Sequence, residues 1–220
     1  MSIAVADGAR LWQHSGTGGA QASSTLIPAI QALLAEAGLG LRQLDAIAFG
    51  HGPGSLTGLR TACSVAQGLA FGAGLPVLGV DTLMAVAEQA RQQHGCTRVL
   101  AVLDARMDQV YAGAYEYAGG RWQRQGAFSL DRPEALALAP GWTLAGNAFD
   151  AYGGRLPAGP RVAARPDAAA LVALAPALLA AGGAVPADQA LPLYIRDKVA
   201  QTTDERMALK LAAARIPSSL

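Results

Sequence analysis

The chain has 220 residues, of which 52% are hydrophobic and 15% charged, and its formal net charge is +1. This composition is typical of a globular protein and excludes an intrinsically disordered chain. The near-zero net charge excludes a strongly basic surface that would hold nucleic acid unaided.

The sequence also predicts a cytoplasmic protein without a membrane anchor. No unbroken apolar run reaches the roughly 18 to 20 residues that cross a bilayer, and the first residues lack the charged region and cleavage site of a signal peptide. The two cysteines, Cys63 and Cys96, lie far apart without the spacing of metal ligands. We therefore expect reduced, buried thiols.

In chain order, the first half predicts a hairpin followed by alternating strands and helices. Strands at 2–6 and 9–15 are joined by the hairpin turn signal Asp7-Gly8. The other expected elements are helices at 24–37, 56–71 and 82–93 and strands at 44–50 and 77–80. This order favours a mixed sheet with helices on its faces.

Two of these helices carry stripes at helical spacing. On the first, the stripe is Leu26, Ile30, Leu33, Leu34 and Ala37, and on the second it is Gly58, Ala62, Ala66 and Ala70. Either stripe could pack on the chain's own sheet. The small residues of the second stripe would equally let another helix approach closely, so a helix–helix interface is the sharper hypothesis.

A glycine-rich turn precedes the second helix. Gly50, Gly52 and Gly54 permit positive φ and close backbone approach, and Ser55 stands at the expected N-cap. A turn of this kind at a helix N-terminus is able to bind an anion, which makes Gly52, Gly54 and Ser55 weak candidates for a nucleotide contact.

The same turn allows a second interpretation, a dinucleotide-binding enzyme. A strand, the turn at residues 50–55, a helix, and Asp81 after the next strand follow the order of that motif. However, the glycine spacing fits poorly, and Pro53 lacks an N–H that a pyrophosphate would use. Asp81 followed by Thr82 is equally a helix N-cap.

The second half predicts another strand-rich unit. Strands are expected at 98–103, 109–117, 121–128 and 142–145, a helix start at 131–134, and a helix at 167–181. Asp104 at a strand end could bind a metal, but without a second convergent acid we expect a structural role. The histidines, His14, His51 and His94, are isolated, and no metal-binding or nucleophile motif is present.

Several blocks of the sequence resemble the TsaB (YeaZ) family. Residues 52–60 read G-P-G-S-L-T-G-L-R and are similar to the family signature G-P-G-S-F-T-G-L-R. Residues 104–111 are similar to its D-A-R-M-x-E-V-Y block, and 192–196 to its P-x-Y-L-R block. The resemblance covers nearly the whole chain.

This resemblance implies the actin-like ATPase (ribonuclease H-like) fold, an α/β architecture of two lobes with mixed sheets flanked by helices. We place the first lobe at residues 1–97 and the second at 98–199, with 200–220 folding back on the first. In that fold a glycine-rich turn of the second lobe contacts adenosine, which makes Gly146 a weak nucleotide candidate.

The resemblance also implies a function. The chain would be the non-catalytic scaffold that dimerises with and activates TsaD, which transfers a threonylcarbamoyl group to adenosine in tRNA. The TsaE-like ATPase and tRNA would join through that complex, and the chain alone could form a homodimer. No cofactor is expected here, since ATP or ADP and the metal would bind the partner subunits. The expected interface residues are Leu26, Ile30, Leu33, Gly58, Ala62 and Ala66.

Two further expectations accompany the resemblance. TsaB-like proteins usually begin with a strand that has no counterpart here, so we expect that Met1 is not the true start. A peptidase, once proposed for the wider family, is the other rival, and the lack of a nucleophile or metal motif argues against it.

Overall fold

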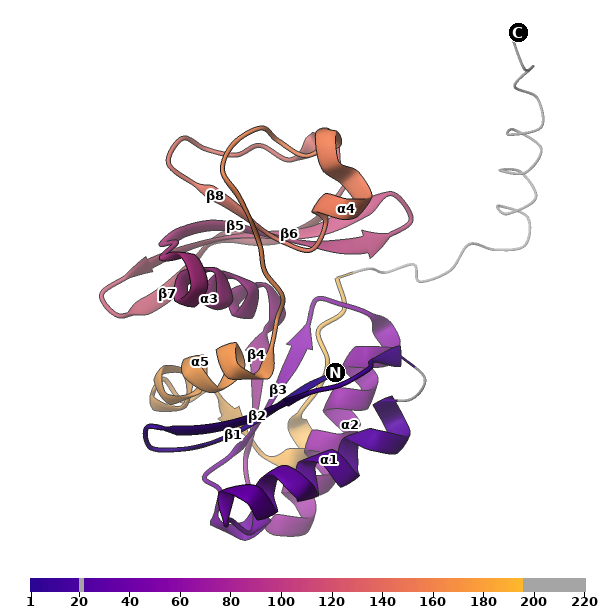
Figure 1. Cartoon of the computed structure of the whole chain (residues 1–220), viewed down its shortest axis with the longest axis vertical. Coiled ribbons are helices and arrows are strands. Elements are labelled where there is room, and N and C mark those ends of the chain that lie inside the picture. The colour runs from indigo at the N-terminus through magenta and orange to yellow at the C-terminus, as the bar shows by residue number, and fades with distance from the viewer. Residues whose placement is uncertain (20–21, 196–220) are drawn as a thin grey trace, which may run out of the picture.

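The computed structural model describes residues 1–19 and 22–195, and it consists of two lobes, one above the other in Figure 1. The predicted 200–220 tail lies outside these residues. The lower lobe contains the hairpin β1 (Ser2–Asp7) and β2 (Arg10–Ser15), then α1 (Ala22–Ala37), β3 (Ile47–Gly52), α2 (Leu56–Ala73) and β4 (Val77–Asp81). Helix α3 (Thr82–His94) follows β4 directly.

The upper lobe contains a five-stranded mixed sheet with the order β7-β6-β5-β8-β9. Its strands are β5 (Arg98–Arg106), β6 (Gln109–Ala118), β7 (Arg121–Asp131), β8 (Thr143–Gly146) and β9 (Arg161–Ala163), with the short helix α4 (Phe149–Tyr152) after β8. Strands β5, β6 and β7 are antiparallel neighbours, whereas β8 and β9 run parallel to β5.

The chain then returns to the lower lobe. Helix α5 (Ala168–Ala180) packs against β1, β3 and β4, and β10 (Ala184–Val185) pairs antiparallel with β4. The lower sheet therefore has the order β10-β4-β3, while β1 and β2 form a separate pair. This return differs from the expected second-lobe range of 98–199, because α5 covers strands of the first lobe.

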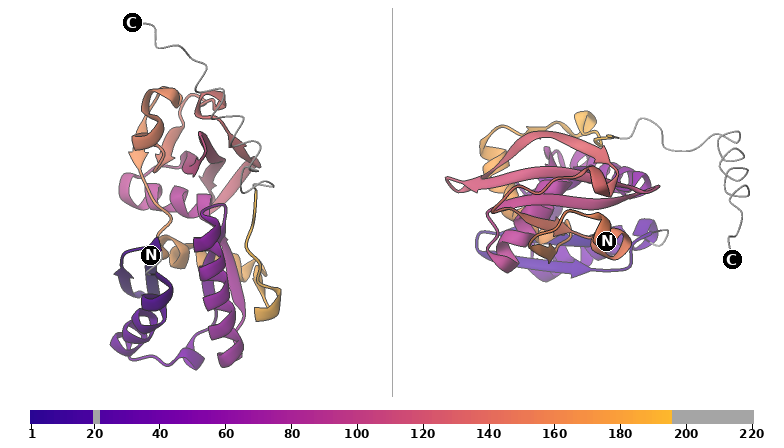
Figure 2. Two further views of the ribbon diagram at one scale, coloured as in Figure 1. Left: turned by 90° about the vertical axis from the view of Figure 1, so that its right-hand side faces the viewer. Right: turned by 90° about the horizontal axis from the view of Figure 1, so that it is seen from above.

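Helix α3 lies across the junction of the two lobes in Figure 1 and in the left view of Figure 2. Its residues Leu83, Val86 and Ala90 are fully buried in the largest hydrophobic cluster. That cluster also contains Leu78 from the lower sheet and Tyr115 from the upper one. The two sheets therefore share one hydrophobic core built around α3. This shared core holds the two lobes in one relative arrangement.

Apart from the helix expected to start at 131–134, the predicted elements are present, with ends that differ by up to three residues. Helix α1 begins at Ala22, two residues before the expected start. The helix start expected at 131–134 is only a short turn, Pro133–Ala135, because β7 continues through Asp131. The sequence did not predict the short strands β9 and β10, because three and two residues are too few to show a periodic pattern of apolar residues.

Candidate functional site

The glycine-rich turn lies where β3 ends and α2 begins. Gly52 has a φ of 133°, and a Cβ added there would lie 2.4 Å from the carbonyl oxygen of Leu193. The Leu193 N–H donates a 2.6 Å hydrogen bond to the oxygen of His51. Glycine is therefore required at position 52 because a later segment of the chain crosses the turn at this point.

The predicted anion contacts, Gly52, Gly54 and Ser55, do lie together in this turn. The Gly52 N–H, however, donates to Oγ1 of Thr82 at 3.0 Å, so it is not free to hold an anion. The Ser55 side chain makes no capping hydrogen bond to α2. Part of the predicted anion site is thus engaged within the protein.

Asp81 is also fully engaged, which removes the basis of the dinucleotide interpretation. Its Oδ1 accepts hydrogen bonds from the backbone N–H groups of Leu83 at 2.9 Å and Met84 at 3.2 Å, capping α3. Its Oδ2 accepts from the Tyr115 hydroxyl at 2.6 Å. Burial raises the pKa of Asp81 despite these bonds and the nearby His51, and it also raises the pKa of Tyr115.

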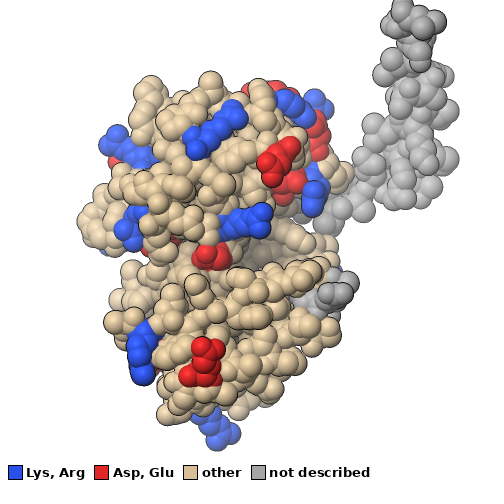
Figure 3. Space-filling view, in the orientation of Figure 1, with Lys and Arg blue, Asp and Glu red and all other residues tan. Residues whose placement is uncertain are grey.

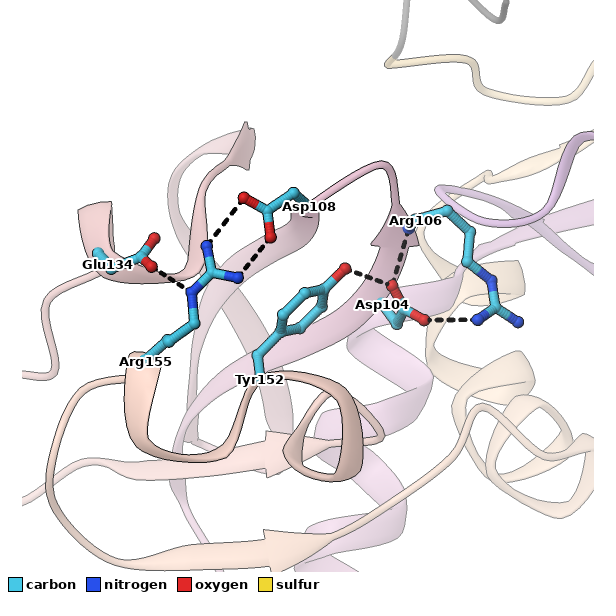
Figure 4. Close-up of polar contacts among 6 residues, drawn as sticks. All are labelled: Asp104, Arg106, Asp108, Glu134, Tyr152 and Arg155. Carbon is cyan, nitrogen blue, oxygen red and sulfur yellow. Dashed lines mark hydrogen bonds and ion pairs between the residues drawn. The ribbon is translucent and has the colours of Figure 1, made fainter. Parts of the chain in front are cut away.

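A polar cluster lies at the end of β5 in the upper lobe (Figure 4). Asp104 Oδ1 accepts from the Arg106 N–H at 2.8 Å and from the Tyr152 hydroxyl at 2.9 Å, while Oδ2 pairs with Arg106 at 3.1 Å. The Asp104 N–H donates to Oδ1 of Asn147 at 3.0 Å. These bonds hold the turn after β5, as expected for a structural Asp104.

One arginine forms ion pairs with two neighbouring carboxylates. Arg155 forms ion pairs with Asp108 and Glu134 (Figure 4). Its guanidinium lowers the pKa of both carboxyls. Since Arg106, Met107 and Asp108 all have positive φ, this pairing fixes a turn that side chains rarely adopt.

Gly146, the second-lobe nucleotide candidate, is buried between strands. Its φ is 154°, and a Cβ there would lie 1.8 Å from the carbonyl oxygen of Val102 on β5. Packing alone therefore requires glycine at this position. The nucleotide contact stays a prediction.

Within residues 1–19 and 22–195, no group of three or more His, Cys, Asp or Glu is placed to hold a metal ion. His51, beside the turn, has a buried Nδ1 atom without a hydrogen-bond partner in the described residues. No helix in the described parts of the chain is long and apolar enough to cross a membrane.

The structure divides the six predicted interface residues into two groups. Leu33 and Ala66 are each only 4% exposed and belong to the chain's own hydrophobic clusters. Leu26, Ile30 and Ala62 are partly buried and pack against those clusters, and only Gly58 is exposed. The interface prediction stays untested, but most of these side chains already serve internal packing.

A different face of α2 points outward. Five of its residues recur at alternating spacings of four and three, and Gly72 lies next to the last of them. We call the set the α2 outer face, and it consists of Thr57, Thr61, Ser64, Gly68, Phe71 and Gly72. None is charged, and Phe71 is 81% exposed. Figure 3 shows that the lower lobe carries few charged side chains on the side in view. Sequence reasoning missed this face because it followed the spacing of four through Gly58.

Comparison with known proteins gives the family. A family model described as TsaD, tRNA N6-adenosine threonylcarbamoyltransferase, matches residues 17–163. The TsaB protein of Escherichia coli K12, named a tRNA threonylcarbamoyladenosine biosynthesis protein, is 35% identical over 187 residues, covering 80% of each chain. The chain belongs to the TsaB family.

Other matches agree with this assignment. A stretch of 86 residues is 52% identical to the TsaB protein of Haemophilus influenzae, covering 39% of this chain and 36% of that one. The solved structure of YeaZ from Pseudomonas aeruginosa superposes with a TM-score of 0.82 at 39% identity, covering 88% of this chain and 93% of that one. The actin-like fold expected from the sequence is thereby confirmed, and the dinucleotide alternative has no support.

Proposed function

We propose that this protein works in tRNA threonylcarbamoyladenosine biosynthesis as a non-catalytic subunit that pairs with a TsaD protein through α2. The names of the TsaB relatives support the pathway. The match to a TsaD family model shows that this chain resembles TsaD itself, so a TsaD partner would share its fold, and two chains of one fold can pair as the two copies of a homodimer do.

The main support for pairing through α2 is the composition of the α2 outer face. Gly68 and Gly72 lie in the middle and last turn of the helix, and a Cβ at either would meet nothing within 4 Å. Glycine inside a helix costs about 0.5 to 1 kcal/mol relative to alanine. Since internal packing does not require these glycines, close approach of another chain explains them best.

Phe71 adds a contact of the kind that anchors interfaces. It lies between the two glycines on the same face, and its ring is almost fully exposed. Aromatic side chains are enriched at protein–protein interfaces, where a ring can fill a pocket of the partner. The proposed interface is therefore Phe71 flanked by Gly68 and Gly72, with Gly58 at the start of the helix.

The non-catalytic role is supported by what the polar side chains do. Asp81 caps α3, Asp104 holds the turn after β5, and Arg155 binds Asp108 and Glu134. These groups are used in folding rather than directed at a common point. The threonylcarbamoyl transfer, the metal and ATP or ADP would then belong to partner subunits, with a TsaE-like ATPase and tRNA joining through the complex.

Reconstitution tests the proposal. The chain, a TsaD protein of the same organism and the remaining pathway components are mixed with unmodified tRNA, and threonylcarbamoyladenosine is measured by mass spectrometry of the digested tRNA. We expect modification only when both proteins are present, together with co-purification of the two. Modification at an unchanged rate without this chain would contradict the proposal.

A further inference from the structure

Residues 186–195 pass along one side of α2, and we call this segment the strap (Figure 1). Its first half is held at Ala190, whose carbonyl oxygen accepts hydrogen bonds from Gln67 Nε2 at 2.8 Å and from Cys63 Sγ at 3.4 Å. Ala190 is itself buried in the hydrophobic cluster between α2 and the lower sheet. The strap is therefore anchored against the middle of the helix.

The second half of the strap is held near the start of α2. The Leu193 N–H donates to the oxygen of His51 at 2.6 Å. The Arg60 Nε atom donates to the Tyr194 hydroxyl at 3.1 Å, and the guanidinium carbon lies 5.8 Å from the centre of the Tyr194 ring. Because Ala190 contacts the middle of α2 and Tyr194 its first turns, the strap runs antiparallel to the helix.

The side of α2 that meets the strap also borders the α2 outer face. Four residues on this side follow one another at spacings of four, three and four, and they are Arg60, Ser64, Gln67 and Phe71. The strap bonds to Arg60 and Gln67 of this stripe. Ser64 and Phe71 belong to the α2 outer face. The strap and the α2 outer face are therefore parts of one continuous surface.

The strap turns two large side chains away from the rest of the protein. Leu191 is 71% exposed and Tyr194 is 47% exposed, although the backbone beside them is fixed by the hydrogen bonds of Ala190 and Leu193. Phe71 is a third large apolar side chain exposed on the same surface. Single exposed apolar residues are ordinary, whereas a group of them on one surface indicates a binding site.

Arg60 adds a positive charge to this surface. Among the described residues, its side chain makes one hydrogen bond, to Tyr194, and no ion pair. A guanidinium has five N–H donors in one plane, and two of them match the two oxygens of a carboxylate. Contact with Tyr194 restricts the side chain in advance, so less conformational freedom is lost when a carboxylate binds. Arginine and tyrosine are also enriched among the residues that contribute most to binding at interfaces.

The α2 outer face is too small to form a stable interface alone. Stable interfaces usually bury about 800 Å² and about 20 to 30 residues on each partner, whereas the α2 outer face has six residues. An interface centred on it has to extend onto a neighbouring surface. The strap is continuous with the α2 outer face, and its exposed side chains are aliphatic and aromatic, as the core of an interface requires.

We propose that the TsaD partner covers the strap as well as the α2 outer face, and that it presents a carboxylate to Arg60 and an apolar pocket to Leu191 and Tyr194. This inference rests on the proposed function, because the partner is the one proposed there. It adds the chemistry of the partner surface, which is acidic at one point and apolar around it. The charge pair fixes the register of the two proteins, while the apolar contacts contribute affinity.

Isothermal titration calorimetry of the full chain with a TsaD protein of the same organism tests the proposal. Leu191→Ser removes an apolar contact, and its control is Leu11→Ser, the same change at an exposed leucine of β2. Arg60→Glu reverses the charge, and its control is Arg121→Glu, the same change at an exposed arginine of β7. We expect Leu191→Ser and Arg60→Glu each to raise Kd at least about tenfold, and both controls to leave Kd within about twofold.

Two variants are needed because they disturb the strap differently. Arg60→Glu also removes the hydrogen bond to Tyr194, so thermal unfolding of each variant checks that the fold is kept. Leu191→Ser changes only an exposed side chain and leaves the hydrogen bonds of Ala190 and Leu193 in place. A loss of affinity in Leu191→Ser therefore reports on the partner rather than on release of the strap.

Four outcomes would overturn the proposal. If both variants pair as tightly as the parent while Gly68→Leu pairs weakly, the proposed function stands and the strap lies outside the interface. Equal effects of Arg60→Glu and Arg121→Glu would show that only net charge matters and that no carboxylate faces Arg60. A dimer of the chain alone that Leu191→Ser dissociates, with unchanged affinity for TsaD, would make a second copy the occupant. Absence of pairing by the parent chain would overturn both this inference and the proposed function.

Discussion

The Tyr115 hydroxyl donates a 2.6 Å hydrogen bond to Oδ2 of Asp81, and this bond joins the two lobes. Tyr115 lies on β6 of the upper sheet, whereas Asp81 ends β4 of the lower sheet and caps α3. The Tyr115 side chain is fully buried. A buried bond between a hydroxyl and a carboxylate is stronger than a neutral one, so it contributes to holding the lobes in one arrangement.

Tyr115→Phe tests this bond, and we expect it to lower the free energy of unfolding by about 2 kcal/mol at pH 7. Burial raises the pKa of Asp81, so this group stabilises the fold fully at low pH and loses that contribution as pH rises through its folded pKa. The Tyr115 bond offsets part of that loss. Urea unfolding should therefore show a larger effect of the substitution at pH 7 than at pH 4.

Tyr111→Phe is the matched control, because Tyr111 lies on the same strand and is also largely buried. In Tyr115→Phe we expect the pKa of Asp81, followed by carboxyl carbon NMR, to rise further above its ordinary range. An unchanged Asp81 titration would show that the hydroxyl does not stabilise the carboxylate.

Glu88 on α3 makes a second buried junction with the upper sheet. Its carboxylate accepts from Trp122 Nε1 at 2.8 Å and from Arg91 at 2.8 and 2.9 Å. Burial opposes ionisation, but hydrogen bonds from Arg91, Trp122 and Gln92 outweigh it and lower the pKa of Glu88. The ionised Glu88 therefore contributes to stability when the pH is above the ordinary pKa of a glutamate. This contribution is lost as the pH falls through the lowered pKa of Glu88 in the folded protein.

Glu88→Gln should cost about 2 kcal/mol at pH 7, because Arg91 loses its charged partner in a partly buried position. The difference from the parent should shrink as pH falls through the lowered pKa of Glu88, where the carboxyl becomes protonated in the folded state as well. Urea unfolding of both proteins at a series of pH values measures this difference in the free energy of unfolding. A difference that stays constant with pH would contradict a role for the Glu88 charge.

Two glycines should respond oppositely to alanine. Gly146→Ala places a Cβ against the Val102 carbonyl at a positive φ, so we expect a loss of about 3 kcal/mol or more. Gly68→Ala places a Cβ in open space on a helix, so we expect the isolated chain to gain about 0.5 to 1 kcal/mol. Thermal unfolding of both variants checks the signs. A stability loss in Gly68→Ala would mean that internal packing requires that glycine.

Much of the fold could be predicted because its signals are local. The Asp7-Gly8 turn, the glycine-rich turn before α2 and the apolar stripe of α1 each follow from neighbouring residues. The return of α5 to the lower lobe could not be predicted, since its alanine-rich sequence would fit either sheet. The contact of Leu193 with the turn at Gly52 could not be predicted either, because it joins residues that are far apart in the chain.

The candidate site shows the same limit. The spacing of small residues on α2 predicted a face through Gly58 and Ala66, but Ala66 packs into the chain's own core. The outward face is rotated to Gly68, Phe71 and Gly72. Sequence spacing identifies a stripe of small residues, whereas only the position of β3 beneath the helix decides which stripe is buried.

The most direct test of the account is the affinity of this chain for a TsaD protein of the same organism, measured by isothermal titration calorimetry with Gly68→Leu. The control is Ala173→Leu, which adds leucine to an exposed position of α5. We expect Gly68→Leu to weaken pairing at least about tenfold, because the helices could no longer approach closely, and Ala173→Leu to leave it unchanged. Equal affinity of Gly68→Leu and the parent chain would contradict pairing through the α2 outer face.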